Sequence, residues 1–261
     1  MIYLSKKYAG EVSFLELNRP AKKNALNKEM IEQIIEYLEK TAESDQFRVL
    51  VISGKNRFLS AGADLEWMRT ATQQDEATNK ADADLFTKLY QTLFNFPKPV
   101  VVCAEGGAYG GAIGLMACAD IVTTTPEASF AFSETRLGLV PATVAPWIIK
   151  KTGLSFARKA FLTGNAFNGT EALESGLAQY NFPPDKIQPK TREIAALIAK
   201  NGPRALRETK MLLNRIDGQI VDIDEDLRQY CSTKIAEART SEEGQKGVEA
   251  FFANRKPSWN Q

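Results

Sequence analysis

The feature that most constrains the fold is the stretch Glu105 to Asp120, EGGAYGGAIGLMACAD, which directly follows the apolar run Pro99 to Ala104. The run predicts a buried strand, and the small apolar residues after the glycines predict a buried helix. Glycines 106, 107, 110 and 111 let a ligand approach the backbone closely. N–H groups at a helix start favour negative charge. The stretch therefore predicts either a site for an oxyanion or a tight turn before a closely packed helix.

A second strand-to-helix junction changes the balance between these alternatives. The apolar run Val49 to Ile52 is followed by Phe58 to Leu65, FLSAGADL, in which Asp64 is placed to cap a helix. Each junction can supply one backbone N–H to the same oxygen. Two convergent N–H donors are the usual oxyanion hole of acyl chemistry.

Composition excludes several classes of function. A net charge of +1 gives no basic footprint for nucleic acid. The absence of histidine removes His-based triads and H-E-x-x-H zinc sites, and we expect no metal. The 3 cysteines follow no C-x-x-C spacing, which suits a reducing cytoplasm. We expect neither a signal peptide at the N-terminus nor a membrane span.

The order of expected elements indicates an α/β fold. Strands are predicted at 12–17, 49–52, 121–125 and 129–132, and helices with apolar stripes begin at Asn27 and include Phe86, Leu89, Tyr90 and Leu93. Strands alternate with helices to about residue 180, which suggests repeated ββα units. From Asp185 onward only helices are predicted, over 194–199, 205–214, 220–238 and 241–254. The polar segment Thr70 to Ala83 is interpreted as a loop or weak helix that acts either as a lid or as a solvated surface segment.

Several short motifs in a fixed order resemble one known family. They are Asn18-Arg19-Pro20, Asn24-Ala25-Leu26, Ser60 to Leu65, Gly106, Gly110-Gly111-Ala112, Ser133 to Leu139 with Pro141, and the tail Lys256-Pro257-Ser258-Trp259. Together they resemble the crotonase family, also called the enoyl-CoA hydratase/isomerase superfamily. The resemblance implies a ββα spiral core at residues 1–195, which holds the CoA and acyl site. It also implies a C-terminal helical region at residues 196–261 that packs at a trimer interface and against the active site.

The resemblance also implies a catalytic set. Crotonases hold the thioester oxygen of an acyl-CoA between two backbone N–H groups, which map here to Ala63 and Gly111. The two-glutamate hydratases add two carboxylates, of which one maps to Glu134 and the other position is Gly114. An apolar run precedes Glu134, so burial should raise its pKa and suit it to acid–base work. The structural alternative is a capping glutamate, or one paired with Arg136 or a lysine.

The substrate-binding positions are assigned on the same basis. Lys22 and Lys23 are expected near the CoA phosphates, and Phe251 and Lys256 resemble a tail segment that touches the nucleotide of a neighbouring subunit. Gly114 is expected to free space for a bulky or branched acyl group. The run from Ala61 to Arg69 is similar to a bacterial subgroup of methylglutaconyl-CoA or related branched glutaconyl-CoA hydratases. The complete set of expected substrate-binding residues is Lys22, Lys23, Ala61, Gly62, Asp64, Leu65, Trp67, Gly110, Gly114, Phe132, Phe251 and Lys256.

Three hypotheses about activity follow. The first is a hydratase that adds water to an α,β-unsaturated acyl-CoA with Glu134 moving the proton. The second is an enoyl-CoA Δ3–Δ2 isomerase, which needs only one carboxylate. The third is an acyl-CoA-binding homologue with little activity. All three require CoA as part of the substrate and no separate cofactor, and the resemblance implies a homotrimer or a hexamer made of two trimers.

Overall fold

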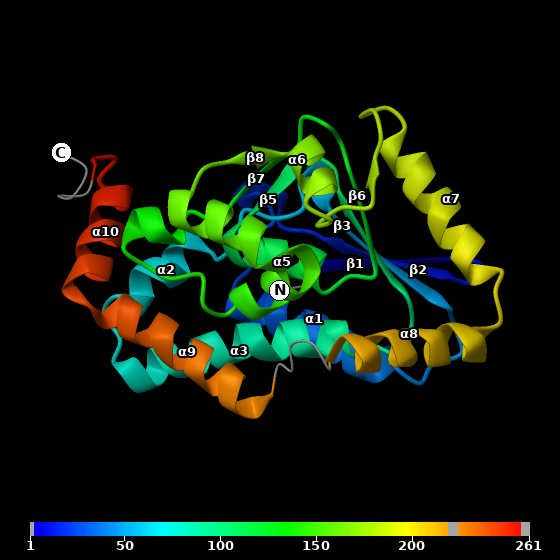
Figure 1. Cartoon of the computed structure of the whole chain (residues 1–261), viewed down its shortest axis with the longest axis horizontal. Coiled ribbons are helices and arrows are strands. Elements are labelled where there is room, and N and C mark those ends of the chain that lie inside the picture. The colour runs from blue at the N-terminus through cyan, green and yellow to red at the C-terminus, as the bar shows by residue number, and fades with distance from the viewer. Residues whose placement is uncertain (1–2, 219–223, 257–261) are drawn as a thin grey trace.

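The computed structural model describes residues 3–218 and 224–256. Its larger sheet has six strands in the order β1-β2-β3-β4-β6-β9. Figure 1 labels β1, β2, β3 and β6 of this sheet. β1 and β2 are antiparallel, and every later neighbour in this sheet is parallel. The strands are β1 (Leu4–Ala9), β2 (Val12–Leu17), β3 (Val49–Gly54), β4 (Val100–Ala104), β6 (Ile121–Thr124) and β9 (Tyr180–Asn181).

A smaller sheet stands beside the larger one and carries the glycine-rich stretch. It has the order β5-β7-β8, with β5 (Gly107–Tyr109), β7 (Ser129–Ala131) and β8 (Phe167–Asn168). The chain therefore passes from β4 in the large sheet to β5 in the small sheet within three residues. This change of sheet places the Gly110-Gly111 pair where segments from both sheets meet.

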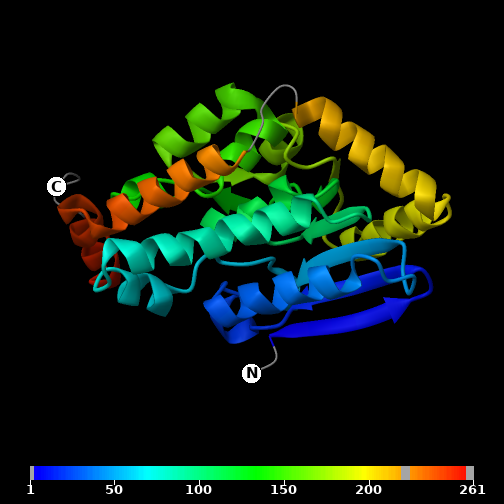
Figure 2. The same cartoon turned by 90° about the horizontal axis from the view of Figure 1, so that it is seen from below.

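Helices cover both faces of the large sheet. Residues of β3 alternate between them: Leu50 and Ile52 belong to the main core with α1 (Lys28–Thr41) and α3 (Glu76–Phe94). Val49 and Val51 instead pack with Ala195 of α7 (Ile187–Ala199). This period of two is expected for a strand that is buried on both sides. Figure 2 shows α1 and α3 side by side, with α9 along α3.

The remaining helices connect or flank these layers. They are α2 (Leu65–Ala71), α4 (Ile113–Ala117), α5 (Ala145–Thr163), α6 (Gly169–Glu174), α8 (Pro203–Gly218), α9 (Glu225–Thr240) and α10 (Glu242–Phe252), with 3-10 turns η1 (Pro20–Lys22), η2 (Lys55–Arg57), η3 (Gly110–Ala112) and η4 (Glu134–Leu137). None of the helices in the described ranges is long and apolar enough to cross a bilayer. The expected all-helical C-terminal region is confirmed, although residues 220–223 and the tail motif at 257–259 lie outside the described residues. The expected boundary at residue 195 falls inside α7.

The polar segment from Thr70 to Ala83 is mostly helical. α2 ends at Ala71, and α3 begins at Glu76 after Asp75, whose side chain accepts from the Thr78 N–H at 2.8 Å. The prediction of a solvated surface is wrong for Asn79 and Ala83, which are fully buried. The Asn79 amide is tolerated there because it donates to the Ala71 carbonyl at 2.8 Å.

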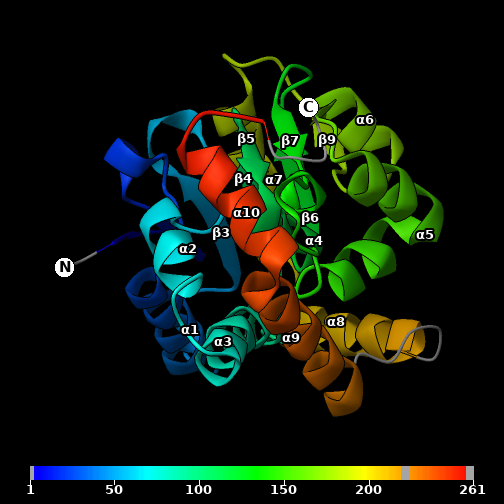
Figure 3. The ribbon, with the colours of Figure 1, turned by 90° about the vertical axis from the view of Figure 1, so that its left-hand side faces the viewer.

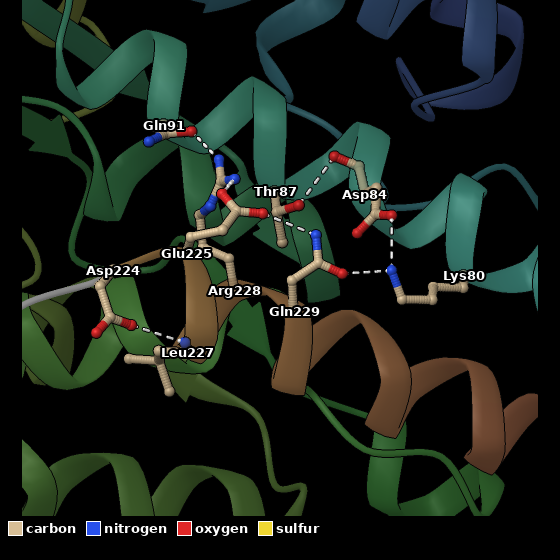
Figure 4. A network of polar contacts seen from close by, with 9 residues as sticks. All are labelled: Lys80, Asp84, Thr87, Gln91, Asp224, Glu225, Leu227, Arg228 and Gln229. Atoms are coloured by element: carbon tan, nitrogen blue, oxygen red, sulfur yellow. Dashed lines mark hydrogen bonds and ion pairs between the residues drawn. The ribbon is translucent and has the colours of Figure 1, made fainter.

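Polar side chains fasten the C-terminal helix α9 to α3 of the same chain (Figure 4). Lys80 contacts both Asp84 and Gln229, and Arg228 donates to Gln91. An apolar cluster of Ala83, Leu139, Ile235 and Val248 then joins α3, α9 and α10 to the segment after η4. The C-terminal region therefore packs against the segment that carries Glu134.

Candidate active site

Three backbone segments converge to form the site. Leu26 forms a parallel bridge with Ala63, and Ser60 forms one with Ala108. The Leu26 N–H donates to the Gly62 carbonyl at 2.7 Å, and the Asp64 N–H donates to the Leu26 carbonyl at 2.9 Å. Gly62 and Asp64 are thus the two residues that bond to Leu26, and Ala63 lies between them. In a parallel bridge such a middle residue directs its own N–H to the opposite edge of the strand. The Ala63 N–H is therefore turned away from Leu26.

Gly62 and Gly110 bring the two glycine-containing junctions together. Gly62 has φ +88°, and a Cβ on it would lie only 2.6 Å from the Tyr109 carbonyl oxygen. Gly110 has φ +49°, and Gly111 follows it in the first turn of η3. N–H groups in a first helical turn have no partner within the helix. The two predicted oxyanion donors, Ala63 and Gly111, thus lie on adjoining segments.

Asp64 fixes the start of α2. Its carboxylate accepts from the Glu66 and Trp67 N–H groups at 2.8 and 3.2 Å and forms an ion pair with Arg19 at 2.5 Å. Burial acts to raise the pKa of Asp64, but the hydrogen bonds from Arg19 and from α2 outweigh it and lower this pKa. The predicted capping role is confirmed. Arg19, for which the sequence suggested no role, holds Asp64 and also donates to the Ala25 carbonyl at 3.0 Å.

Glu134 begins η4 shortly after β7 and lies beside Gly110, the neighbour of the predicted oxyanion donor Gly111. A Cβ built on Gly110 would lie 3.1 Å from Glu134 Oε1. The residue as a whole is half-buried, but its Oε2 is shielded from solvent and has no hydrogen-bond partner among the described residues. Burial raises the pKa of Glu134 to about 7. A carboxyl group with this pKa can both accept and release a proton near neutral pH.

Among the described residues, Glu134 forms no ion pair with Arg136 or with a lysine. Arg136 points elsewhere, because its guanidinium bonds to the Asn165 side chain and packs against Gly164. The carboxyl group of Glu134 accepts no capping hydrogen bond at Oε2. A buried polar atom without a partner is costly, and this one belongs to a carboxyl group beside Gly110, so Glu134 is a functional candidate.

The space beside Gly114 is filled, so the expectation that it frees room for a branched acyl group is wrong. Tyr90, which is fully buried on α3, places its ring where a side chain at position 114 would stand. A Cβ on Gly114 would lie 2.3 Å from Tyr90 Cε1. The sequence predicted that Tyr90 would be buried but gave no sign of what it would face.

Aromatic residues separate into those beside the site and those in the core. Trp67 stacks on Phe86 with ring centroids 5.6 Å apart, and a Cβ on Gly111 would meet Phe86 at 3.1 Å. Phe132 instead packs edge-on against Phe161 at 4.7 Å within the buried core. Leu65 is 49% exposed on the first turn of α2. Of these expected acyl-binding residues, Trp67 is connected to Gly111 through its contact with Phe86.

The residues expected at the CoA end lie at the surface. Lys22 and Lys23 are exposed on the turn that η1 makes, and Lys23 Nζ lies 5.8 Å from the centroid of the Phe58 ring. The Lys23 carbonyl accepts from the Ala61 N–H at 2.9 Å, which ties this turn to the oxyanion segment. Phe251 and Lys256 are also exposed. Figure 3 shows α2 and α10 at the same end of the molecule.

A surface cavity of about 520 Å³ lies away from these residues. Its lining includes Arg57 and Glu105, which form an ion pair, and none of the predicted site residues. The described residues also contain no group of three acidic or cysteine side chains placed to hold a metal.

Comparison with known proteins agrees with the geometry. The family model described as enoyl-CoA hydratase/isomerase matches residues 7–261. The chain belongs to this family. It is 32% identical to the 2,3-dehydroadipyl-CoA hydratase of Escherichia coli over 95% of this chain and 94% of that protein. It is 30% identical to a putative enoyl-CoA hydratase of Thermus thermophilus over 95% of this chain and 97% of that one.

A solved structure extends the likeness to the fold. The crystal structure of an enoyl-CoA hydratase from Shewanella pealeana superposes with a TM-score of 0.80 at 35% identity, covering 99% of this chain and 96% of that one. The crotonase fold expected from the motifs is thereby confirmed. Family membership supports a CoA thioester as the substrate.

Proposed function

We propose that this chain is an enoyl-CoA hydratase in which Glu134 is the acid–base group and the Ala63 and Gly111 N–H groups form the oxyanion hole. The observation that carries the proposal is the Glu134 carboxyl group, which lies beside Gly110 and has one buried oxygen without a partner in the part of the chain that the structure describes. A carboxylate in this place can reach the α and β carbons of a thioester whose oxygen is bound at Gly111. The hydratase names of the relatives support the same activity.

One carboxylate is sufficient for the proposed hydration. Ionised Glu134 takes a proton from a water molecule as the water oxygen bonds to Cβ. The electron pair of the double bond moves toward the thioester oxygen, where the two backbone N–H groups stabilise the enolate. Glu134 then returns the proton to Cα as the enolate collapses. The net result is addition of one water across the double bond, with both groups delivered to the face that Glu134 occupies.

A specific observation favours isomerisation as the second candidate. Tyr90 occupies the space beside Gly114, so the site has no carboxylate at the position that the two-glutamate hydratases use. A Δ3–Δ2 isomerase needs one base, which removes a proton from Cα of the 3-enoyl-CoA and returns it to Cγ, while the double bond moves into conjugation with the thioester. Glu134 and the same oxyanion hole would serve this reaction.

The substrate we propose is a branched or dicarboxylic enoyl-CoA of the methylglutaconyl type. The similarity of Ala61 to Arg69 to that subgroup supports it, and the name of the Escherichia coli relative also describes a dicarboxylic acyl group. Lys22 and Lys23 are proposed to meet the CoA phosphates as point charges. We also propose a cytoplasmic homotrimer or hexamer. The exposed apolar residues of α8, which are Met211, Leu212, Leu213 and Ile216, are consistent with such an assembly.

The test follows the absorbance of the conjugated thioester. Crotonyl-CoA, 3-methylglutaconyl-CoA and 2,3-dehydroadipyl-CoA should lose this absorbance with the wild type, and Glu134→Gln should slow the loss by roughly 100-fold or more. The matched control is Glu127→Gln, which removes an exposed glutamate from the turn between β6 and β7 and should behave as the wild type. Gain of absorbance from a 3-enoyl-CoA without any hydration would establish the isomerase instead. Tight binding of CoA thioesters without turnover of any of them would refute both activities and support a non-catalytic binder.

A further inference from the structure

The ring of Tyr90 fills the space beside Gly114, the position at which the two-glutamate hydratases have a carboxylate. Its ring is fully buried, and three of its atoms lie 2.3, 2.5 and 3.0 Å from where a Cβ on Gly114 would be. Distances this short exclude any side chain at position 114 unless the ring moves. Gly114 and Tyr90 therefore form a complementary pair across α4 and α3.

The hydroxyl of Tyr90 is directed at the oxyanion glycine. It donates to the Gly111 carbonyl oxygen at 2.7 Å, and a Cβ on Gly111 would lie 2.9 Å from the hydroxyl oxygen. Phe86, one helical turn earlier on α3, lies against the same face of Gly111 at 3.1 Å. Two side chains of one helix thus hold a residue whose backbone would otherwise be unusually free.

The same helix also reaches the other half of the oxyanion hole. Phe86 stacks on Trp67, and the Trp67 indole donates to Asp82 at 2.7 Å. Trp67 belongs to α2, which starts directly after Ala63 and Asp64. α3 therefore contacts the segments that carry both N–H donors, with Tyr90 on the Gly111 side.

We propose that Tyr90 is a positioning residue that sets the direction of the Gly111 N–H in the oxyanion hole. The inference rests on the proposed function, because it assumes that a thioester oxygen binds at Gly111. Tyr90 acts through Gly111, and its hydroxyl bonds to the protein backbone. An oxyanion donor is effective only when it is held at hydrogen-bond distance from the developing charge, so a looser Gly111 should slow the reaction.

The test compares Tyr90→Phe with the wild type. Phenylalanine keeps the ring beside Gly114 and removes the hydroxyl that bonds to the Gly111 carbonyl and also contacts the Thr143 side chain. We expect kcat to fall about tenfold, which is less than the loss of a whole donor, while KM for the acyl-CoA changes less than about twofold. The Raman carbonyl stretch of bound cinnamoyl-CoA should move toward its value in water, because the thioester oxygen accepts weaker hydrogen bonds.

Tyr37→Phe is the matched control. Tyr37 is also a buried tyrosine of the main core, and its hydroxyl shares a 2.6 Å hydrogen bond with Ser13 between α1 and β2. Its loss should cost stability without changing kcat or the carbonyl frequency. If Tyr90→Phe matches Tyr37→Phe in both readouts, Tyr90 is only a core residue and the proposal is overturned.

A second variant tests the same contact from the other side. Gly114→Ala should displace the Tyr90 ring. It should therefore lower kcat and move the carbonyl stretch of bound cinnamoyl-CoA toward its value in water. Adding Tyr90→Phe to this variant should change kcat and the carbonyl stretch little further. Fully additive losses would contradict a shared mechanism. Failure of the proposed function would be seen separately, as unchanged turnover in Glu134→Gln. The carbonyl frequency of bound cinnamoyl-CoA would still decide the role of Tyr90 in that case.

Discussion

At the scale of single residues, the position proposed for Glu134 in catalysis carries a cost in stability. Its Oε2 is enclosed without a hydrogen-bond partner, and burial raises its pKa to about 7 from an ordinary value of 4.5. Enclosing an ionised carboxylate is unfavourable, so the folded state holds the proton of this group more tightly than the unfolded state does. The same property that suits Glu134 to proton transfer therefore makes the protein less stable at high pH.

This cost predicts a pH-dependent effect of Glu134→Gln on stability. Below pH 4.5 the carboxyl group is protonated in both states, and its contribution to stability is fully present. That contribution is lost as the pH rises through about 7. The variant should therefore exceed the wild type at pH 8 by up to about 3 kcal/mol in free energy of unfolding, and the difference should shrink toward zero near pH 4.5. Urea unfolding at pH 8 and pH 5 measures it.

The exposed Glu127→Gln is the control for this measurement as well, since its removal should give no such trend. A difference between Glu134→Gln and the wild type that stays the same at both pH values would contradict a raised pKa for Glu134.

Some residues of the candidate site could be predicted from the sequence, and Tyr90 could not. Ala63, Gly111 and Glu134 were predicted as site residues from the family resemblance of the motifs that carry them, and the structure brings their segments together, while their roles stay predictions. Tyr90 could not be assigned, because its periodic spacing predicts burial without identifying a partner. Only the packing of α3 against α4 shows that the tyrosine fills the space at Gly114.

At the scale of elements, the first half of helix α3 departs from what the sequence predicts. The residues of its first half are mostly polar, yet Asn79 and Asp82 are buried. Asn79 donates a hydrogen bond to the Ala71 carbonyl, and Asp82 accepts one from the Trp67 indole. Hydrophobic periodicity misses a helix whose buried face is partly polar. The predicted strands 121–125 and 129–132 agree with β6 and β7 to within one residue at either end, whereas the two-residue strands β8 and β9 carry too little pattern to be recognised.

The docking of α9 predicts the effect of Ile235→Ala. Ile235 is 5% exposed in the cluster with Leu139, and the Leu139 N–H bonds to the Glu134 carbonyl at 3.0 Å. Truncation should leave a cavity and lower the free energy of unfolding by about 2–4 kcal/mol. We expect kcat to fall less than in Glu134→Gln, because only the support of η4 is loosened. Urea unfolding and the absorbance assay give the two quantities.

Glu237→Ala is the control on the same helix. Glu237 is exposed and, among the residues that the structure describes, its side chain pairs only with Lys234, so its loss should change stability by less than about 0.5 kcal/mol. If Ile235→Ala lowers the free energy of unfolding by less than about 1 kcal/mol, this cluster does not stabilise the packing of α9.

At the scale of the whole molecule, alternation of strands and helices indicated an α/β fold but could not give its topology. The change from the large sheet to the small one occurs at Glu105 and Gly106, and nothing in the apolar pattern marks it. The family motifs supplied the architecture, because their order is tied to the positions at which the sheets meet. The division at residue 195 and the oligomeric state stay predictions.

The whole arrangement predicts one capability that does not depend on the final reaction. If Ala63 and Gly111 bind the thioester oxygen and Glu134 lies at Cα, the protein should exchange the α-protons of a saturated thioester with solvent. Butyryl-CoA is suitable, because it can be neither hydrated nor isomerised. The most direct measurement is therefore deuterium incorporation at Cα of butyryl-CoA in D₂O, followed by NMR. We predict exchange with the wild type and Glu127→Gln, and a rate reduced by roughly 100-fold or more with Glu134→Gln. Equal exchange rates in the wild type and Glu134→Gln would contradict the assignment of Glu134 as the proton-transfer group.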